Sequence, residues 1–471
     1  MNSPAAYRIT DVTVVDTRDG VRTAHQDVRI ADGRISEIGP AGRTPEAGDV
    51  DGSGMFLVPG YVDMHSHVLG LPDPADALGL MLSFGITGYR QMAGSRDLLR
   101  RRRTGAFDDS PDTPRLFGLP GDVLTPLNAG TPAAATREVA EQAAAGADFI
   151  KAALITPEVY FAAQQEADRH KIPVLGHLPA GVDVRAASKA GFRSIEHLGP
   201  GLGVLAGCSH HEHELVANDH GRSLPLPPFK IPFMDKIMGR LMARLVVNPS
   251  QMTTPAQLLA MRDALDSFDE DRSRELAREF AANDTWNCPT LIRVQAQELC
   301  DSPQFASDPD LRYITPKVRR TWAKAAASFE RKFSAGQREI FAAQFERQLQ
   351  LVRLFHEEGV PLLAGTDAVG AAWVVAGSSL HREFALLARA GLPPLAVLQS
   401  ATLSPARFLG REDLAGSVEV GKEADLVLLS ADPIADSAHL QAITGVVRDG
   451  VHRSATELQA VKDRVAVRGV G

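Results

Sequence analysis

Through the middle of the chain, short apolar segments with the character of β-strands alternate with longer stretches rich in Ala, Leu, Arg and Glu. The expected strands are residues 56–64, 147–150, 172–175, 194–195 and 360–363, and the expected helices include residues 133–145, 157–169, 184–190 and 338–358. Such alternation is typical of repeated βα units around a parallel sheet. It predicts a TIM-like (β/α)8 barrel over residues 58–412.

The two ends of the chain have a different pattern, in which apolar and polar residues alternate over short stretches. Turn signals stand at Asp19-Gly20 and Asp32-Gly33 near the start, and at Asp449-Gly450 near the end. Asp-Gly between alternating runs predicts tight hairpins. We therefore expect residues 1–57 and 413–471 to form together one small β-sandwich domain beside the barrel.

A helical insertion is expected between strands 6 and 8 of the barrel. The chain from His197 to Asp367 is much longer than the roughly 60 residues that two βα units need in a typical barrel. The excess places the insertion at about residues 205–285, with residues 233–247 rich in Leu and Met. Because loops at the carboxyl ends of barrel strands lie over the active site, parts of the insertion are expected to form a lid.

Charge, hydropathy and cysteine content exclude several classes of protein. The 471 residues carry a formal charge of −8, the basic run 100–103 is short, and no apolar run is long enough to span a bilayer. Neither a secretory signal nor CxxC spacing among Cys208, Cys288 and Cys300 is present. We expect a cytoplasmic protein that binds neither nucleic acid nor membranes, and the sequence leaves open whether it forms a homo-oligomer.

Every expected strand of the barrel ends in a residue that can bind a metal ion. These residues are His65, His67, Lys151, His177, His197 and Asp367. The carboxyl ends of barrel strands meet at one face, and a His-x-His pair on a strand points both imidazoles to the same side. With so few cysteines, the ligands of a metal must be histidines and carboxylates. The six residues are therefore the predicted metal site.

Lys151 is the unusual member of this set, because an ammonium group repels a cation. One interpretation is a lysine that extends from a strand end toward solvent. The other is that two nearby divalent ions favour the neutral amine, which adds carbon dioxide to form an anionic carbamate. The two oxygens of a carbamate on Lys151 could bridge both ions.

The motifs themselves resemble those of the amidohydrolase superfamily. They are residues 59–67 (PGYVDMHSH), 149–151 (FIK), 176–177 (GH), 194–198 (SIEHL) and 364–367 (AGTD). The resemblance is strongest to the imidazolonepropionase-related, prolidase-like branch, which has a binuclear metal centre and a carbamylated lysine. It implies that His65, His67 and Asp367 hold one divalent ion, that His177 and His197 hold another, and that the carbamate of Lys151 bridges them. Zinc is the expected ion.

The resemblance implies hydrolysis of an amide or related C–N bond in a small molecule such as a dipeptide, an N-acyl amino acid or a cyclic amide. A hydroxide that bridges the metals would attack a polarised carbonyl. Asp367 is the best candidate to accept the proton and pass it to the leaving amine. A carbamate, ester or lactone hydrolase remains an alternative on the same site, and a non-catalytic binding protein is disfavoured because all six ligand types are present.

Several polar residues outside the six predicted metal ligands have two possible interpretations each. His381 is a candidate for contacting the substrate or orienting Asp367, and the alternative is a structural histidine of a helix. Arg293 is a candidate for binding a substrate carboxylate, and the alternative is a salt bridge at the rim of the barrel. Glu196 should point away from the site, because neighbours on a strand alternate. The cluster of Cys208, His210, His211 and His213 is interpreted as a segment lining the mouth of the barrel, against a second metal site.

Overall fold

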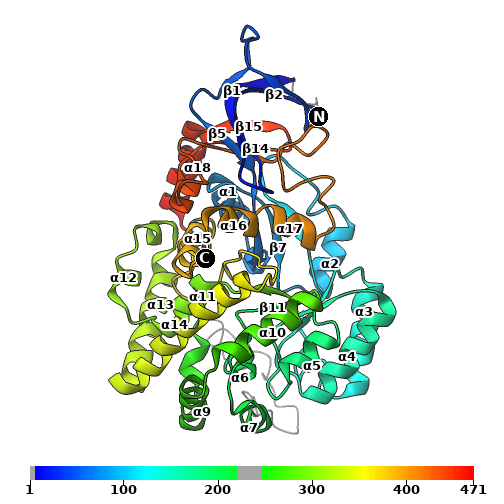
Figure 1. Cartoon of the computed structure of the whole chain (residues 1–471), viewed down its shortest axis with the longest axis vertical. Coiled ribbons are helices and arrows are strands. Elements are labelled where there is room, and N and C mark those ends of the chain that lie inside the picture. The colour runs from blue at the N-terminus through cyan, green and yellow to red at the C-terminus, as the bar shows by residue number, and fades with distance from the viewer. Residues whose placement is uncertain (1–5, 220–246) are drawn as a thin grey trace.

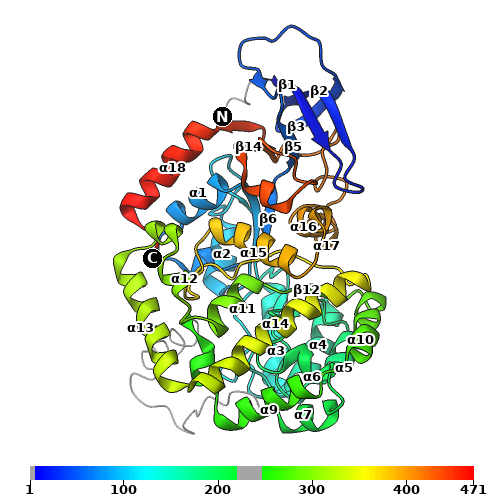
Figure 2. The same ribbon diagram turned by 60° about the vertical axis from the view of Figure 1, so that its left-hand side comes forward.

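The computed structural model of the chain describes residues 6–219 and 247–471. A β-sheet lies at one end of the molecule, and a larger part of mixed helices and strands lies beneath it (Figure 1). The same arrangement is visible after rotation in Figure 2, where the last helix runs along one side. Within the described residues, no helix combines the length and the apolar character needed to cross a bilayer.

Both ends of the chain contribute strands to one sheet. Its strand order is β15-β14-β13-β5-β1-β2-β3, and β4 pairs with β1. The sheet consists of β1 (Tyr7–Val15), β2 (Arg22–Ala31), β3 (Arg34–Pro40), β4 (Val50–Asp51), β5 (Phe56–Pro59), β13 (Leu426–Leu429), β14 (Ile443–Arg448) and β15 (Val451–Ser454). The two ends meet where β5 pairs antiparallel with β13. The strands thus form one continuously paired sheet rather than two separate layers.

The predicted hairpin turns explain how this sheet is formed. Asp32 and Gly33 both have positive φ, of 50° and 73°, as do Asp449 and Gly450, with 53° and 75°. Two successive residues with positive φ make the turn that matches the twist of a hairpin, and Asp-Gly is a preferred pair there. The sheet buries a small apolar core of its own, which includes Ile9, Val28, Ile35, Leu57, Leu426 and Val447.

The remaining strands are parallel and lie in two groups, β6-β7-β8 and β12-β11-β10-β9. They are β6 (Tyr61–Ser66), β7 (Ile86–Gln91), β8 (Arg115–Gly118), β9 (Ile150–Ala152), β10 (Val174–Gly176), β11 (Ser194–Glu196) and β12 (Trp286–Cys288). Residues 361–368 bridge the groups, since Leu362 pairs with Asn287 of β12 and Ala368 pairs with Ser66 of β6. The predicted strand 56–64 is in fact two strands, β5 and β6, which belong to different sheets.

Helices follow most of the parallel strands and cover them (Figure 2). The chain order is α1 (Ala75–Ser83), α2 (Arg96–Arg103), α3 (Pro132–Ala144), α4 (Pro157–His170), α5 (Val184–Lys189), α15 (Ser378–Arg389), α16 (Pro394–Ser400), α17 (Leu403–Phe408) and α18 (Ala455–Arg468), with the inserted helices between α5 and α15. The helices predicted at residues 133–145, 157–169 and 184–190 are confirmed as α3, α4 and α5. Thr131 caps α3 and Asp183 caps α5 through side-chain oxygens, which explains where these helices begin.

The extra length between His197 and Asp367 is divided between two connections. The first, before β12, contains α6 (Gly203–Gly207), α7 (Glu212–Asn218), α9 (Pro255–Asp266) and α10 (Glu270–Ala282). The second, after β12, contains α11 (Leu291–Glu298), α12 (Pro303–Ala306), α13 (Pro316–Lys332) and α14 (Ala335–Glu357), the last being the helix predicted at 338–358. Figure 1 shows α6, α7 and α9 at the end of the molecule opposite the terminal sheet. The Leu/Met-rich stretch lies, up to residue 246, outside the described residues.

We expect Leu363→Ala to lower the free energy of unfolding by about 2 to 5 kcal/mol, because it leaves a cavity among packed side chains. Leu363 is fully buried and packs with Val62, Met64, Trp286 and Cys288. Denaturant unfolding followed by circular dichroism measures the change. Leu259→Ala is the matched control, since Leu259 is 72% exposed and its truncation should change stability by less than about 0.5 kcal/mol. Equal losses in the two variants would contradict this view of the core.

Candidate metal centre

The His-x-His pair lies at the carboxyl end of β6. His65 is fully buried in the strand, and His67 follows the strand with a side chain that is 24% exposed. Both imidazoles meet the same carboxylate oxygen: Oδ1 of Asp367 is 3.1 Å from Nε2 of His65 and 2.7 Å from Nε2 of His67. The alternation of a strand therefore brings both rings to one point, as predicted.

Asp367 is held in place by its own backbone and by its neighbours. Its N–H donates to the carbonyl oxygen of His65 at 2.7 Å. The preceding Thr366 donates its hydroxyl to Asp63 at 2.6 Å, and Asp63 also accepts the N–H of His65 at 3.1 Å. Gly365 has no room for a side chain, because a Cβ there would lie 2.7 Å from Cβ of His65. These contacts fasten the Asp367 segment directly onto β6.

His177 and His197 approach the pair from the neighbouring strands. His177 follows β10 and His197 follows β11. The ring centroids of His177 and His197 are 5.2 Å apart, and those of His65 and His197 are 4.6 Å apart. His65, His197 and Asp367 each offer one ligand atom within 4.8 Å of the others. Side chains that are far apart in the sequence thus converge at one end of the parallel strands.

Lys151 lies in the middle of β9 rather than at its end, and it is only 3% exposed. Within the described residues its Nζ atom has no hydrogen-bond partner. Burial lowers the pKa of this amine to about 8, although the charges of Glu196 and Asp367 oppose the shift. Gly176 makes room for the lysine, because a Cβ at that position would lie 2.9 Å from Cδ of Lys151. A buried and unpartnered amine of this kind fits a lysine that is modified or held near a ligand.

The charge states of the other residues suit metal binding. Burial lowers the pKa of His67, and it lowers the pKa of His177 and His197 well below the usual value. Burial alone would raise the pKa of Asp367, but the neighbouring His67 and His65 hold it well below its usual range. At neutral pH the site therefore offers the neutral imidazoles of His67, His177 and His197 and the anionic carboxylate of Asp367, which are the kinds of nitrogen and oxygen ligand that zinc and similar ions prefer.

Comparison with known proteins agrees with this geometry. Residues 331–455 match the amidohydrolase family, a segment that includes Asp367. The whole chain is similar to the solved structure of bottromycin amidohydrolase, with 26% identity, a TM-score of 0.71, and coverage of 100% of this chain and 92% of the other. Residues 331–455 thus match the amidohydrolase family, and the chain as a whole has the fold of an amidohydrolase. Amidohydrolases are hydrolases that generally use divalent metal ions.

Other relatives share the fold at lower identity or over less of the chain. A Xaa-Pro dipeptidase structure with bound methionine is 18% identical, with a TM-score of 0.61 over 96% of this chain and all of the other. A prolidase-named structure from Bifidobacterium longum is 21% identical, with a TM-score of 0.60 and 98% of each chain covered. The N-acetylglucosamine-6-phosphate deacetylase of Lysinibacillus sphaericus is 33% identical over 102 residues, which are 21% of this chain and a quarter of that protein.

Glu196 is part of this candidate site, although the sequence pattern predicted that it points away. Its Oε2 lies 2.6 Å from Nδ1 of His65, and its Oε1 accepts from Arg90 and from the hydroxyl of Ser194, each at 2.8 Å. Glu196 and Arg90 are almost completely buried. A carboxylate on the second nitrogen of a metal-binding histidine fixes which nitrogen faces the metal. The prediction from strand alternation that Glu196 points away from the site is therefore wrong, because its carboxylate lies against His65.

The buried group of His65, Glu196 and Cys288 could be mistaken for a second metal site, because its ligand atoms lie within 4.8 Å of one another. Arg90 already neutralises Glu196, and its guanidinium would repel a cation. Burial also raises the pKa of the Cys288 thiol well above its usual value, so the thiolate that binds metals is disfavoured. This inner group is a structural support for the site above it.

Arg293 and His381, the two predicted substrate-binding residues, lie in different places relative to the candidate metal centre. Arg293 lies in the first turn of α11, and its Nε is 2.9 Å from Oδ2 of Asp367. It therefore contacts a ligand of the centre, and its substitution would disturb Asp367 as well as any substrate. His381 does not lie at the centre: its Nε2 donates to the carbonyl of Phe84 at 2.9 Å, and its ring packs against Tyr61 and Phe384. This placement between helices does not support contact with substrate.

The cluster after β11 forms ordinary surface ion pairs. His210 pairs with Asp269 at 3.0 Å and His211 pairs with Asp263 at 2.9 Å, and both imidazoles are at least half exposed. Cys208 is buried and its thiol lies apart in the core. The cluster directly follows α6, which Figure 1 shows toward the end of the molecule opposite the terminal sheet. Its interpretation as a lining of the mouth stays a prediction.

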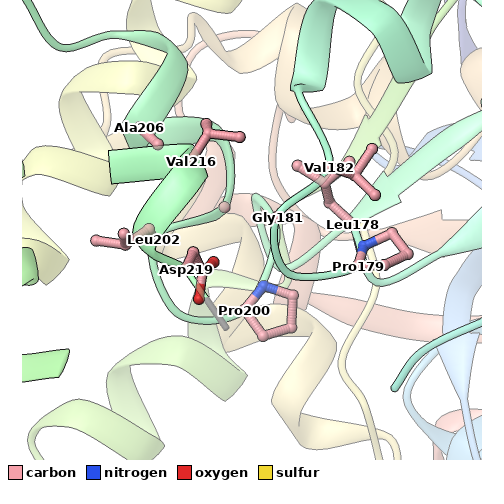
Figure 3. Close-up of a pocket in the computed structure, with 10 residues that line it drawn as sticks. Leu178, Pro179, Gly181, Val182, Pro200, Leu202, Ala206, Val216 and Asp219 are labelled. Carbon is pink, nitrogen blue, oxygen red and sulfur yellow. The ribbon is translucent and has the colours of Figure 1, made fainter. Parts of the chain in front are cut away.

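A small pocket is lined by residues that follow His177 and His197 in the sequence (Figure 3). Leu178, Pro179 and Val182, which follow His177, line one side, and residues of the segment after His197 line the other. That second side is formed by Leu202, Ala206 and Val216, with Asp219 and Pro200 drawn below them. The loops that carry two of the histidines therefore also provide an apolar wall.

We expect Glu196→Gln to destabilise the protein by about 3 to 5 kcal/mol, because it leaves the buried guanidinium of Arg90 without its charge partner. Denaturant unfolding of the metal-free protein measures this. The exposed pair of Glu346 and Arg389 is the control, and Glu346→Gln should cost less than about 1 kcal/mol. In the double variant Glu196→Gln, Arg90→Met, part of the loss should be recovered. Additive losses would show that the two residues do not act as a pair.

We also expect a pH dependence of stability from His381. Burial lowers its pKa to about 4, below the ordinary value of about 6.5, so the folded protein keeps this imidazole neutral. As the pH falls from 6.5 toward 4, the unfolded chain takes up a proton that the folded chain excludes, and stability is lost. Between pH 7.5 and 5, the melting temperature of the wild type should therefore fall more than that of His381→Gln. Parallel pH profiles would contradict this.

Proposed function

We propose that the chain is a metal-dependent hydrolase that cleaves an amide or related C–N bond in a small molecule. The observation that carries the proposal is the convergence of His65, His197 and Asp367 within 4.8 Å, with His67 on the same carboxylate oxygen. Four imidazoles and a carboxylate at the ends of neighbouring strands form a donor set with no evident purely structural role. Because the chain is similar to amidohydrolases, we assign metal-dependent hydrolysis to this set of nitrogen and oxygen ligands.

The scaffold that we infer for this site is a closed β/α barrel. Residues 361–368 are bonded to β12 on one side and to β6 on the other. Leu124 also pairs with Ala152 of β9, close to the point where β8 ends. Eight consecutive segments would then surround the core under the site. In this scheme residues 58–412 are the hydrolase domain, and residues 1–57 and 413–471 form the companion β domain.

Two divalent ions, of which zinc is the expected one, would be held by the six predicted residues. His65, His67 and Asp367 would hold one ion, and His177 and His197 the other. Lys151, as a carbamate formed with carbon dioxide, would bridge them. The unpartnered and buried Nζ of Lys151 supports this role, because an ordinary lysine seldom stays buried without a partner. When bound, the ions would supply a hydroxide nucleophile near neutral pH and polarise the scissile carbonyl.

The residues of the chain would then bind, orient and transfer a proton. Asp367 is the proton acceptor we propose, because it is anionic and central to the cluster. Arg293 holds its Oδ2, so that Oδ1 remains turned toward His65 and His67. After the C–N bond breaks, Asp367 would return the proton to the leaving amine. The acid and base steps are thus assigned to one carboxylate.

The substrate that we propose has an apolar portion next to the scissile bond. The small pocket after His177 and His197 in the sequence supports this, since Leu178, Val182, Leu202 and Val216 contribute apolar side chains to its lining. Similar solved structures include a bottromycin amidohydrolase and a Xaa-Pro dipeptidase. Dipeptides, N-acyl amino acids and cyclic amides are therefore the first classes to test, with esters, lactones and carbamates as the competing classes.

We expect the purified protein to contain close to two zinc-like ions per chain, measured by elemental mass spectrometry. Lys151→Ala should lose one or both ions and at least a hundredfold in kcat, because the bridging anion is missing. Short carboxylates such as formate or propionate should restore part of the activity. Lys189→Ala is the control, since Lys189 lies exposed at the end of α5. Full activity and full metal content in Lys151→Ala would refute the binuclear centre.

A further inference from the structure

The first turn of α11 contacts two proposed metal ligands that come from different strands. Thr290, the residue just before α11, meets His197, and Arg293 meets Asp367. Both residues are buried, as are Leu291 and Ile292 between them. One short segment of the chain thus lies against His197 of one proposed metal position and Asp367 of the other.

The hydrogen bonds of Thr290 determine the tautomer of His197. The Thr290 hydroxyl lies 2.8 Å from the carbonyl oxygen of Pro289, and it also contacts Nδ1 of His197. A carbonyl oxygen can only accept, so the single hydroxyl proton points to Pro289. The hydroxyl oxygen must then accept a proton from Nδ1 of His197. This leaves the lone pair of His197 on Nε2, the other ring nitrogen.

Thr290 makes these contacts from an unfavourable backbone conformation. Its φ of 43° and ψ of 52° lie in the left-handed region, which β-branched residues rarely adopt. Such strained positions persist only where the surroundings impose them, and they cluster at functional sites. The left-handed backbone conformation of Thr290 must therefore be stabilised by contacts from another part of the chain.

Glu383 of α15 is that element. Its two carboxylate oxygens accept the N–H groups of Leu291 at 2.9 Å and Ile292 at 2.7 Å. These are the first N–H groups of α11, and the helix has no side-chain cap of its own. Burial raises the pKa of Glu383 to about 8, and these two N–H groups oppose that shift; the carboxyl oxygens satisfy N–H groups that a helix start otherwise leaves without partners. Glu383 is fully buried, so it clamps the start of α11 from a neighbouring helix.

We propose that Thr290, clamped through α11 by Glu383, is a positioning residue that presents Nε2 of His197 to a metal ion. This rests on the metal-dependent function proposed above. The same helical turn orients Asp367 through Arg293, so the two metal positions share one support. Thr290 itself contacts neither the substrate nor the reacting atoms in this scheme; it acts through His197.

The test compares Thr290→Val with Thr290→Ser. Valine keeps the shape and branching of threonine but lacks the hydroxyl, whereas serine keeps the hydroxyl. Zinc titration of the metal-stripped protein should show two ions bound by the wild type, and one of them weakened by about 10- to 100-fold in the valine variant. Serine should restore the affinity to within about threefold. Thr321→Val, on the exposed face of α13, is the control for the substitution itself.

A second measurement does not depend on metal or activity. Nitrogen NMR of the metal-free protein with labelled histidine should show His197 protonated at Nδ1 in the wild type and in Thr290→Ser, and a mixture of tautomers in Thr290→Val. Glu383→Gln should produce the same mixture more weakly, because the amide keeps one of the two acceptor oxygens and replaces the other with an N–H donor group. The valine variant retaining both the wild-type tautomer and the wild-type zinc affinities would overturn the proposal.

The two proposals can fail separately. A wild type that binds no zinc and hydrolyses nothing contradicts the metal-dependent function, whatever the tautomer of His197. A wild type with two ions and activity, combined with a valine variant identical to it in both measurements, contradicts only the role of Thr290. Thermal unfolding of each variant identifies any loss that comes from misfolding, and if the valine variant misfolds, a wild-type tautomer of His197 in Glu383→Gln would contradict the proposal.

Discussion

The carboxylate of Asp367 is the contact on which the arrangement of the site depends. Its Oδ1 faces the Nε2 atoms of both histidines from β6, and its Oδ2 is held by Arg293 of α11. Its backbone N–H is bonded to the same strand that carries His65. An anionic group with this many charged and polar neighbours is costly to bury and is stabilised only when all of them are in place. The segment before it, with Gly365 and Thr366 packed on β6, therefore has little freedom to vary.

Beneath the site, a second layer of buried charge supports the first. Glu196 joins His65 to Arg90, and Arg90 donates its Nε to the carbonyl of Met64 at 2.7 Å. Phe408 and Phe149 lie against the Arg90 guanidinium, with ring centroids 5.0 Å and 5.8 Å away. Aromatic faces compensate part of the lost hydration of a buried cation. The inner pair thus holds the pKa of Glu196 at about 2 despite its burial, so that an anion always faces His65.

Strand periodicity predicted which residues converge at the proposed metal site, but it could not predict the residues that support them. His65, His67, His177, His197 and Asp367 follow apolar strand segments, and parallel strands bring such positions together. Alternation predicts that Glu196 points away from the site, because it gives the side of a strand and not the depth of a residue within the interior. The roles of Thr290, Arg293 and Glu383 depend on how α11 meets α15, which no local pattern reveals. His381 has helical spacing beside Asp367 in the sequence, yet α15 turns it toward Phe84, away from the centre.

The terminal sheet also contributes to the geometry of the metal centre, although it lies far from it. β6, the strand of the His-x-His pair, begins only one residue after β5 ends, and β5 is paired with both β1 and β13. Gly60 lies between them, where a Cβ would clash with Thr87 of β7 at 2.1 Å. The connection is therefore too tight to let β6 slide along its neighbour. A one-residue slip would turn His65 and His67 to the opposite side of the strand, so the pairing of the two chain ends helps to set the register of the ligands.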